Sequence, residues 1–479
     1  MTTTTTTWGL ALLVGLLLIN GTAARESDYC YSYESYPYVS MATKTAYQFA
    51  HGKARLQPVP SCTPIQIWIL ARHGTRYPDS ADIGRLVSLS KLRDQILYNH
   101  ETRGHGRMCD QDLQRLRNWR PNPNMIEFNA DLLTEQGNED MRLFAKRLQS
   151  YFPELLRTNL YSVSYQSFKF RSTATQRTQA SMEAFMEGLF GRVNVIPPEA
   201  IPNPDNLLRA YKQCPAWLRG SDINDDETSE KFKFVSGPEY QNLLNNVSSR
   251  LGFAYAIHND SIQLMYDMCR YDKAWNIAEL SPWCSVFSKQ ELMILEYTED
   301  LEEYYKSGPG REVNSKLGCP LLNDMFDHFK NLERGNFNNE PRGIFYFAHS
   351  TTLLNLLSSL DIRKDTTPLL SHNYHSMERR RFKTSEIDAF ASNLVAVFYR
   401  CSELQPNKVM FFLNEQPVYL DGCSVGLCDW EYLKGRFGHE ADKCNLDYCY
   451  NVASSSFSIL QVVYSTIGLV LSMRFLGAL

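Results

Sequence analysis

The residues best suited to carry out a chemical reaction lie in one short polar segment, residues 72–78, which read RHGTRYP. Two guanidinium groups a few positions apart repel each other, and a protein core has no use for them unless an anion lies between them. Each guanidinium is a planar fork that pairs with two phosphate oxygens at once. A neutral imidazole at His73, held against a phosphate that Arg72 and Arg76 neutralise, can attack phosphorus and form a phosphohistidine. We therefore predict a phosphate site here, where Gly74 lets the backbone approach the ligand closely.

A buried strand must hold this segment in place. Residues 65–71, directly before it, form a nearly continuous apolar run rich in β-branched residues, which is typical of a central strand. Residues 343–348 form a second such run, and residues 161–170 are also strand-like. Thr134 is placed to cap a helix. Helical spacing recurs in residues 134–148, 174–190 and 352–360. Strands that alternate with helices predict an α/β domain.

The middle of the chain has a different character. Strand-like runs are scarce there, and charged amphipathic stretches such as residues 288–306 dominate. We interpret this part as a mostly helical insertion that caps the α/β domain, with a cleft at the carboxyl edge of the sheet beneath it. The predicted organisation is a signal peptide at 1–24, a first α/β part at 25–204, a helical cap at 205–340, a second α/β part at 341–450 and a hydrophobic tail at 451–479.

Several segments together resemble a known family. Residues 72–78 resemble the RHGxRxP signature of the histidine acid phosphatases, and His349 follows the second buried run as that family's second active-site histidine does. Residues 133–137 and 171–178 resemble two further family segments, in the family's order. Within the family, the chain is more similar to the multiple inositol-polyphosphate phosphatase branch. The segments that carry this nearer resemblance are residues 127–141, 184–190, 391–394 and 412–415, with Phe382.

The resemblance implies a fold and a mechanism. The fold is a phosphoglycerate-mutase-like α/β domain with a mostly α-helical cap, and the substrate lies between them. His73 would be the nucleophile, and His349 would help to hold the phosphoryl group and stabilise charge in the transition state. The mechanism needs no metal and no other cofactor. The phosphate-binding residues would be Arg72, Arg76 and Arg177, with Arg171 as their neighbour.

The resemblance also implies a substrate class. Members of this branch act on inositol polyphosphates such as phytate, and some act on 2,3-bisphosphoglycerate. A polyanionic small molecule of this kind needs basic residues around the pocket. Candidates for this role, each also explicable as a solvated surface residue, are Lys91, Arg93, Lys212 and the run 379–383.

The chain departs from the family at one position. The family protonates the leaving group with a carboxylate that stands directly after the second histidine, or two places after it in the inositol-polyphosphate branch. Here those positions are Ser350 and Thr351, and neither is acidic. A hydroxyl can relay a proton but is too weak an acid to replace a carboxyl group, and general acid catalysis contributes about 10²- to 10⁴-fold in rate. Three hypotheses follow: an enzyme whose acid comes from elsewhere, a slow enzyme, and a phosphate-binding protein without useful turnover.

Composition restricts the partners. The net charge of −4 gives no general attraction to nucleic acid, so we expect no nucleic-acid partner. The twelve cysteines fit no zinc spacing, and their even number suits an oxidising compartment. Two glycosylation sequons, at Asn246 and Asn259, agree with export. Export argues against membership of the mutase branch of the wider superfamily, whose members are usually cytosolic. The mutases also have a histidine after an arginine, but they lack the TRxP residues that follow it here.

Both ends of the chain are apolar. Residues 8–19 followed by the small residues 21–24 are typical of a signal peptide, with a buried helix as the alternative. Residues 457–479, preceded by four small residues, resemble a GPI-attachment signal, although Arg474 interrupts them. A single membrane-spanning helix and a buried terminal helix are the alternatives. We therefore predict a protein of the secretory pathway, located outside the cell or at its surface, or in the lumen of the endoplasmic reticulum.

Overall fold

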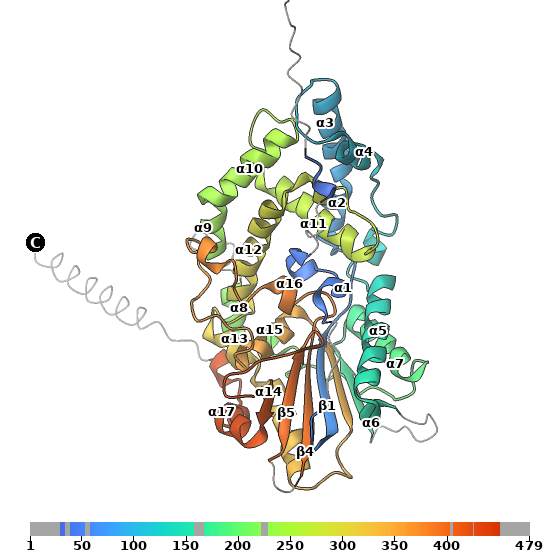
Figure 1. Cartoon of the computed structure of the whole chain (residues 1–479), viewed down its shortest axis with the longest axis vertical. Helices are drawn as coiled ribbons and strands as arrows, with labels where there is room; N and C mark the ends of the chain where they lie inside the picture. The colour runs from blue at the N-terminus through green and yellow to red at the C-terminus, as the bar shows by residue number, and fades with distance from the viewer. Residues whose placement is uncertain are drawn as a thin grey trace, which may run out of the picture.

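Figure 1 shows the computed structural model, whose described residues are 29–33, 39–52, 58–157, 167–221, 229–402, 406–424 and 426–450. One mixed sheet of seven strands organises this described part of the chain, in the order β2-β3-β1-β4-β5-β6, with β7 paired to β5. The strands are β1 Cys62–Arg72, β2 Phe168–Ser172, β3 Gly343–Ala348, β4 Asn393–Cys401, β5 Lys408–Leu413, β6 Gln416–Pro417 and β7 Leu427–Asp429. The sheet and its many helices confirm the predicted α/β class.

Strand directions decide which residues meet at one edge of the sheet. β3 pairs in parallel with both β1 and β2, and Arg72 at the end of β1 lies opposite Ala348 at the end of β3. β4 runs antiparallel to β1, and its first residue, Asn393, lies opposite Ala71. The residues that follow β1, β2 and β3 therefore share an edge with the residues that precede β4.

Helices cover both faces of the sheet (Figure 1). Along β1, Ile67 and Ile69 pack into one apolar cluster while Trp68 and Leu70 pack into another, as the two-residue period of a strand requires. Burial of both faces explains why residues 65–71 form an unbroken apolar run. The first cluster includes α5 Glu135–Tyr151, α6 Pro153–Leu156 and α7 Gln176–Phe190. The second includes α14 Cys319–Glu333, α15 Ser350–Ser359 and α17 Trp430–Asp442.

A third apolar cluster forms the helical body beyond the carboxyl edge of the sheet (Figure 1). It joins α2 Ser80–Val87, α3 Leu89–Glu101 and α4 Asp110–Asn118 to α10 Pro238–Arg250, α11 Asn259–Trp275 and the first half of α12 Lys289–Lys306. The remaining helices are α1 Tyr47–Ala50, α8 Pro215–Ser221, α9 Glu230–Val235, α13 Glu312–Leu317 and α16 Thr384–Ile387. The helical body thus draws on segments both before and within residues 205–340, and the domain boundaries given above stay a prediction.

The predicted elements agree with the strands and helices observed. Residues 65–71 lie within β1, residues 343–348 are β3, and the described end of the strand-like stretch 161–170 belongs to β2. The helix predicted from Thr134 is α5, and the Thr134 hydroxyl accepts a hydrogen bond from the backbone N–H of Gly137 at 3.2 Å. This bond satisfies one of the amide groups left free at a helix N-terminus.

All twelve cysteines form disulfides, in the pairs Cys30–Cys109, Cys62–Cys401, Cys214–Cys449, Cys269–Cys284, Cys319–Cys444 and Cys423–Cys428. Six disulfides are consistent with the secretory pathway. Among the helices that the structure describes, none combines the length and the apolar character needed to cross a membrane. The predicted signal peptide at 1–24 and the tail at 451–479 lie outside the described residues.

Candidate active site

Three polar side chains follow three parallel strands and so reach the same edge of the sheet. His73 comes after β1, Thr173 after β2 and His349 after β3. The backbone N–H of His73 donates to the carbonyl of Ala348 at 3.1 Å, and that of Thr173 donates to the carbonyl of Phe347 at 3.1 Å. The two histidine rings lie 5.8 Å apart, from centroid to centroid. The structure thus brings together the two histidines that the sequence singled out.

His73 has the geometry and the protonation state of a nucleophile. Its Nδ1 lies 2.9 Å from the carbonyl oxygen of Gly74. Because a carbonyl only accepts, Nδ1 carries the proton and the lone pair is on Nε2. Burial, then the charge of Arg72, lower the pKa of His73 well below its usual range. The ring is therefore neutral across the physiological pH range, as attack on phosphorus requires.

The predicted arginines Arg72, Arg76 and Arg177 all lie close enough to His73 for their charges to lower its pKa. Arg72 is buried, and its Nη1 donates to the carbonyl of Thr43 at 2.7 Å and to the carbonyl of Asp388. Its guanidinium also lies 5.1 Å from the ring centroid of Phe390, within range of a cation–π contact. These contacts fix the direction in which Arg72 presents its charge.

The other two arginines share one carboxylate. The Oδ1 of Asp131 lies 3.3 Å from Arg76 Nη1 and 3.4 Å from Arg177 Nη1. Two cations held by a single anion are placed as a bound phosphate would need them. A phosphate that pairs with both guanidiniums must also compete with this carboxylate or lie beside it. Sequence reasoning did not identify Asp131, which no motif distinguishes from a surface aspartate.

His349 is held by the network that follows β2. Its Nε2 lies 2.9 Å from Thr173 Oγ1, which in turn lies 2.8 Å from Thr178 Oγ1. Burial and the charge of Arg177 lower the pKa of His349, so the ring is neutral in the free protein. It occupies the N-cap position of α15. The hydrogen-bonded hydroxyl groups of Thr173 and Thr178 therefore fix the ring of His349. The ring lies where the N-terminus of α15 faces the site.

Arg171 is placed differently from the other predicted arginines. It lies on β2 and forms an ion pair with Asp205. A phosphate would have to displace that carboxylate to bind it, so these contacts do not support a direct role in phosphate binding. Arg209, which sequence reasoning missed, lies nearer to the site, since its charge lowers the pKa of both His349 and Arg177.

The hydroxyls of the two residues after His349 contact other side chains. The Thr351 hydroxyl accepts a hydrogen bond from Ser307 Oγ at 3.3 Å, and the Ser350 hydroxyl donates to a carboxylate oxygen of Asp388. Both positions after His349 thus carry hydroxyls that contact other side chains. Asp388 was not predicted, although an acidic residue between Ile387 and Ala389, inside an apolar stretch, is a signal that could have found it.

The packing of the backbone gives a second reason for a glycine at position 74, besides the predicted approach to a ligand. A Cβ added to Gly74 would lie 2.6 Å from the carbonyl oxygen of Gly137, and one added to Gly137 would lie 2.3 Å from the carbonyl oxygen of Thr75. The two glycines let the start of α5 pack directly against the loop that carries His73. Close packing of protein backbones, and not only approach to a ligand, requires a glycine here.

The predicted basic residues around the pocket lie in three different places. Lys212 lines a cavity of about 470 Å³ together with Arg209 and Asp205. Arg380, from the run 379–383, is buried and forms ion pairs with Glu296 and Asp300, so its role is structural. Two others lie on α3: Lys91, which is exposed, and Arg93, which donates to the carbonyl of Trp119 at 2.7 Å.

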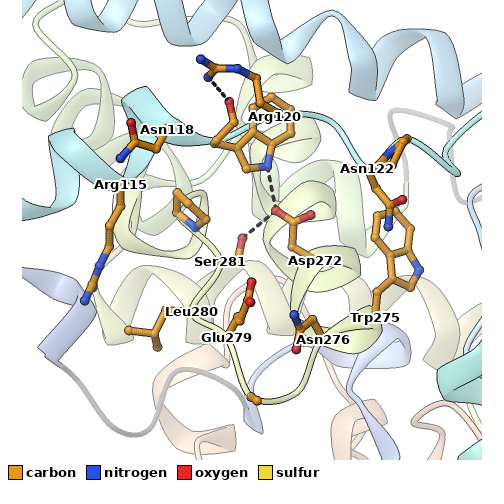
Figure 2. Close-up of a pocket in the computed structure, with 14 residues that line it drawn as sticks. Arg115, Asn118, Arg120, Asn122, Asp272, Trp275, Asn276, Glu279, Leu280 and Ser281 are labelled. Atoms are coloured by element: carbon orange, nitrogen blue, oxygen red, sulfur yellow. Dashed lines mark hydrogen bonds between the residues drawn. The ribbon is translucent and has the colours of Figure 1, made fainter.

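A larger cavity, of about 750 Å³, lies in the helical body and is shown in Figure 2. Asp272 points into it, and its Oδ2 accepts from Trp119 Nε1 at 3.0 Å and from Ser281 Oγ at 3.1 Å. The predicted catalytic and phosphate-binding residues are absent from its lining, within the described part of the chain. Trp275 connects it to the site, because its indole N–H donates to the carbonyl of Arg76 at 3.1 Å.

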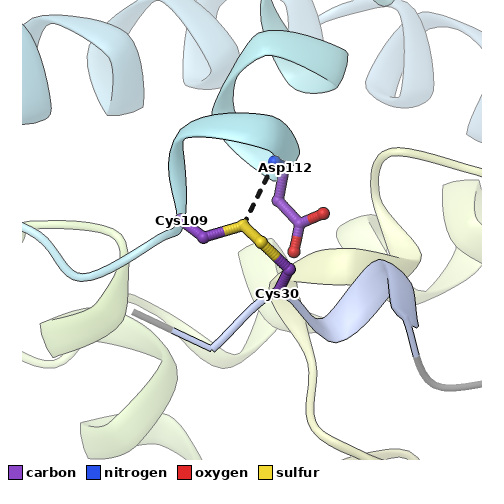
Figure 3. A group of neighbouring side chains, drawn as sticks. All are labelled: Cys30, Cys109 and Asp112. Atoms are coloured by element: carbon purple, nitrogen blue, oxygen red, sulfur yellow. Dashed lines mark hydrogen bonds between the residues drawn. A yellow bond between two sulfur atoms is a disulfide. The ribbon is translucent and has the colours of Figure 1, made fainter. Parts of the chain in front are cut away.

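One group of potential metal ligands occurs among the described residues, at Cys30, Cys109 and Asp112 (Figure 3). Both sulfur atoms belong to one disulfide, and Cys109 Sγ accepts from the backbone N–H of Asp112 at 3.4 Å. Disulfide sulfur is not the thiolate that a metal binds. This group is therefore a disulfide at a helix N-terminus.

The predicted glycosylation sites lie on the helical body. Asn246 is exposed on α10, and Asn259, the first residue of α11, is half-buried with its side-chain oxygen accepting from the hydroxyl of Tyr240.

Two buried histidines and a cluster of arginines at the carboxyl edge of an α/β sheet are suited to binding and transferring a phosphoryl group. The chain belongs to the histidine phosphatase superfamily (branch 2), whose model matches residues 65–414. This membership confirms the family predicted from the RHGTRYP segment.

Curated relatives place the chain within that family. It is 40% identical over 448 residues to multiple inositol polyphosphate phosphatase 1 of Drosophila melanogaster, covering 91% of this chain and 93% of the relative. It is 31% identical over 408 residues to the protein of the same name from Homo sapiens, covering 80% and 81%. The predicted resemblance to this branch is confirmed.

Solved structures share the fold. A phytase from D. castellii superposes with a TM-score of 0.69 at 17% identity, covering 93% of this chain and 94% of that one. A multiple inositol polyphosphate phosphatase of Bifidobacterium longum, in complex with inositol hexasulfate, superposes with a TM-score of 0.56 at 14% identity, covering 84% and 98%. These similarities confirm the α/β fold with its helical additions.

Proposed function

We propose that this protein hydrolyses the phosphate monoesters of inositol polyphosphates through a phosphohistidine at His73. The observation that carries the proposal is the state of His73: its Nδ1 is bonded to the Gly74 carbonyl, its pKa is low, and its Nε2 lone pair is free among three arginines. The relatives of this chain are named as inositol polyphosphate phosphatases, which supports the substrate class.

The reaction has two steps. In the first, His73 Nε2 attacks phosphorus, a P–N bond forms and the P–O bond to the alcohol breaks. In the second, water attacks the phosphohistidine, the P–N bond breaks, and inorganic phosphate and free His73 result. Arg72, Arg76 and Arg177 hold the phosphoryl oxygens in both steps and stabilise the charge that develops on them. His349, fixed by Thr173, is placed to bind the same phosphoryl group.

A polyphosphorylated substrate brings further phosphates that need partners. Arg209 and Lys212 line one cavity, and the charge of Arg209 lowers the pKa of both Arg177 and His349. The Nε of Arg209 is buried without a hydrogen-bond partner. A buried unpaired donor of this kind gains from an anionic acceptor. These two residues are placed to bind a second phosphate of the same substrate molecule.

A second candidate function is binding of polyphosphorylated ligands without useful turnover. The observation that favours it is the hydroxyl at both positions after His349. Without a proton donor, release of an alkoxide from an alkyl phosphate is slow, whereas release of an acidic phenol is not. An alkyl phosphate and an aryl phosphate therefore distinguish the two functions, because only the alkyl leaving group needs a proton donor.

The test is phosphate release from phytate and from an aryl phosphate between pH 4 and pH 8, with the protein made through a secretory pathway and with His73→Ala as control. We expect release from both substrates by the natural protein and none by His73→Ala. Turnover of the aryl phosphate alone would restrict the function to activated esters. No turnover of either, with inositol hexakisphosphate still raising the melting temperature, would favour the binding protein.

We further propose that residues 1–24 direct export, that Asn246 and Asn259 carry glycans, and that residues 451–479 attach the protein to the cell surface through a lipid anchor. An even set of disulfide-bonded cysteines and the sequence patterns of both ends support this. Release of the protein from cell membranes by a GPI-specific phospholipase is the expected result. Retention after that treatment, with release by detergent, would favour a membrane-spanning tail instead.

A further inference from the structure

A buried carboxyl group lies behind the residue that follows His349. Asp388 comes directly after α16 and five residues before β4, so the antiparallel direction of β4 brings it to the edge where β1 and β3 end. Its side chain is fully buried. Its Oδ2 accepts a hydrogen bond from Ser350 Oγ and lies 3.7 Å from Arg72 Nη1. Its Oδ1 has no hydrogen-bond partner.

Ser350 connects this carboxyl group to the site. It is the first residue of α15, next to His349, and it is half-buried, while Asp388 is inaccessible. Its hydroxyl therefore contacts Asp388 on one side and can contact a bound ligand on the other. Ser350 also occupies the position at which most members of the family carry their acid.

We propose that Asp388 supplies the proton for the leaving group and that the Ser350 hydroxyl relays it. The proposal rests on the function proposed above and deepens it. Ser350 is the residue that touches the leaving oxygen, and Asp388 is the positioning residue behind it. The acid that the sequence lacks after His349 is thus provided by a residue 38 positions beyond Ser350.

The proton balance of the relay closes over the two steps. The relay acts from the protonated state of Asp388, in which the carboxyl O–H donates to Ser350 Oγ and the Ser350 O–H turns towards the leaving oxygen, so the hydrogen bond between the two residues is reversed. As the P–O bond breaks, the Ser350 hydroxyl gives its proton to the leaving alkoxide and takes the proton of the Asp388 carboxyl group. The alcohol leaves neutral and Asp388 becomes a carboxylate. When water attacks the phosphohistidine, it gives one proton to Ser350, and Ser350 returns its own to Asp388. Each cycle therefore regenerates the protonated acid.

The surroundings of Asp388 keep a proton available at the right pH. Burial raises the pKa of Asp388 to about 7, and the charge of Arg72 on β1 and the hydrogen bond from Ser350 on α15 oppose this shift. Glu303, on α12, raises the pKa further. A carboxyl group with this pKa is protonated in acidic solution and about half protonated at neutral pH, which lies close to the optimum for a general acid.

A rival path runs through the other hydroxyl. The Thr351 hydroxyl accepts from Ser307, which lies next to Glu303, a residue whose pKa burial also raises. Glu303 Oε1 lies 3.9 Å from the ammonium group of Lys306, which favours its charged form. A proton from Glu303 must cross two hydroxyls, whereas one from Asp388 crosses a single hydroxyl. The direct contact with Ser350 therefore makes Asp388 the better donor.

The experiment compares two leaving groups in variants of the full chain. The variants are Asp388→Asn, Ser350→Ala, both together, and Glu303→Gln. The matched control is Asp272→Asn, because the pKa of Asp272 is also raised to about 7 by burial but its carboxyl group lies in the cavity of the helical body. Substrates are an alkyl phosphate of the inositol class, whose leaving group needs a proton, and 4-nitrophenyl phosphate, whose leaving group does not.

We expect Asp388→Asn and Ser350→Ala each to lower kcat on the alkyl phosphate by about 10²- to 10⁴-fold, with at most a few-fold loss on 4-nitrophenyl phosphate. The double variant should lose no more than either single variant, because both remove the same relay. In the natural protein kcat on the alkyl phosphate should fall above about pH 7, and the variants should lack this dependence.

Other outcomes overturn the relay. Equal losses on both substrates mean that Asp388 serves the structure, and unchanged alkyl-phosphate turnover means that it supplies no proton. A selective loss in Glu303→Gln alone moves the acid to the rival path. None of these three outcomes contradicts the proposed phosphohistidine mechanism. Turnover that survives His73→Ala, in contrast, would contradict the proposed function itself. Ser350→Ala leaves the buried carboxyl group in place, so it still tests the relay if Asp388→Asn does not fold.

Discussion

Replacing Asp131 with asparagine should strengthen the binding of phosphate to the site. The Asp131 carboxylate is shared by Arg76 and Arg177, and a phosphate must compete with it for both. The substitution keeps the size of the side chain and removes its charge. Asp131 has a backbone φ of 64°, in the left-handed region that asparagine tolerates well, so the loop should keep its conformation.

The structure sets the size of the effect. The two ion pairs have N–O distances of 3.3 and 3.4 Å, and the Asp131 side chain is 42% exposed. Exposed pairs of this kind are worth about 0.2–1 kcal/mol each. Their joint loss therefore removes about 0.4–2 kcal/mol of competition, which is about a 2- to 30-fold decrease in the inhibition constant of inorganic phosphate.

The assay is competitive inhibition of 4-nitrophenyl phosphate hydrolysis by inorganic phosphate, at low and at high ionic strength. KM should fall together with the inhibition constant, and the difference from the natural protein should shrink in salt because the pairs are exposed. Asp94→Asn is the control, since Asp94 is an exposed acid on α3 that pairs with Arg93. A higher KM and weaker inhibition in Asp131→Asn would refute the reasoning, because Asp131 would then hold the arginines in place instead of competing for them.

Two further predictions concern the second histidine and the helical body. Thr173→Val keeps the shape of a fully buried side chain but removes the hydroxyl that lies 2.9 Å from His349 Nε2, so kcat/KM should fall by about 5- to 30-fold, which corresponds to about 1–2 kcal/mol. Unchanged kcat/KM would mean that His349 is held by other contacts. Asp272 has its pKa raised to about 7, so it binds its proton more tightly in the folded state; its contribution to stability is complete at low pH and is lost as pH rises through 7. Asp272→Asn should therefore remove about 2–3 kcal/mol of the stability gained between pH 8 and pH 5, because about two pH units separate the pKa from pH 5 and each is worth about 1.4 kcal/mol. Parallel stability curves in denaturant titrations would contradict this.

The site residues that could be predicted from the sequence are those that directly follow a buried strand of the sheet. His73 and His349 directly follow two buried strands whose apolar runs are unambiguous, and Arg72 and Arg76 belong to the same segment as His73. Parallel strands end at a common edge, so two short segments far apart in the chain could be placed together before the structure was known. Arg177 followed from the resemblance to the family.

The parts that sequence reasoning missed depend on contacts between distant segments. Asp131 is placed by the loop before α5, and Arg209 by the segment before α8; neither position has a periodicity or motif that indicates a site. Gly74 shows the same limit in another form. The sequence predicted a glycine for approach to a ligand, but the second reason for it, the close backbone of Gly137, follows only from the packing of α5. Side-chain partners of this kind follow from tertiary packing, which a local pattern does not contain.

The topology of the sheet explains how a proton donor can change position while the fold stays the same. Residues reach the catalytic edge in two ways: by following a parallel strand, as His349 and Ser350 do, or by preceding the antiparallel strand β4, as Asp388 does. Because both kinds of segment end at one place, a carboxyl group lost from one can be supplied by the other through a single hydroxyl. The absence of an acid after His349 therefore does not by itself indicate loss of activity. The ratio of alkyl- to aryl-phosphate turnover in Asp388→Asn measures whether the segment before β4 supplies the proton.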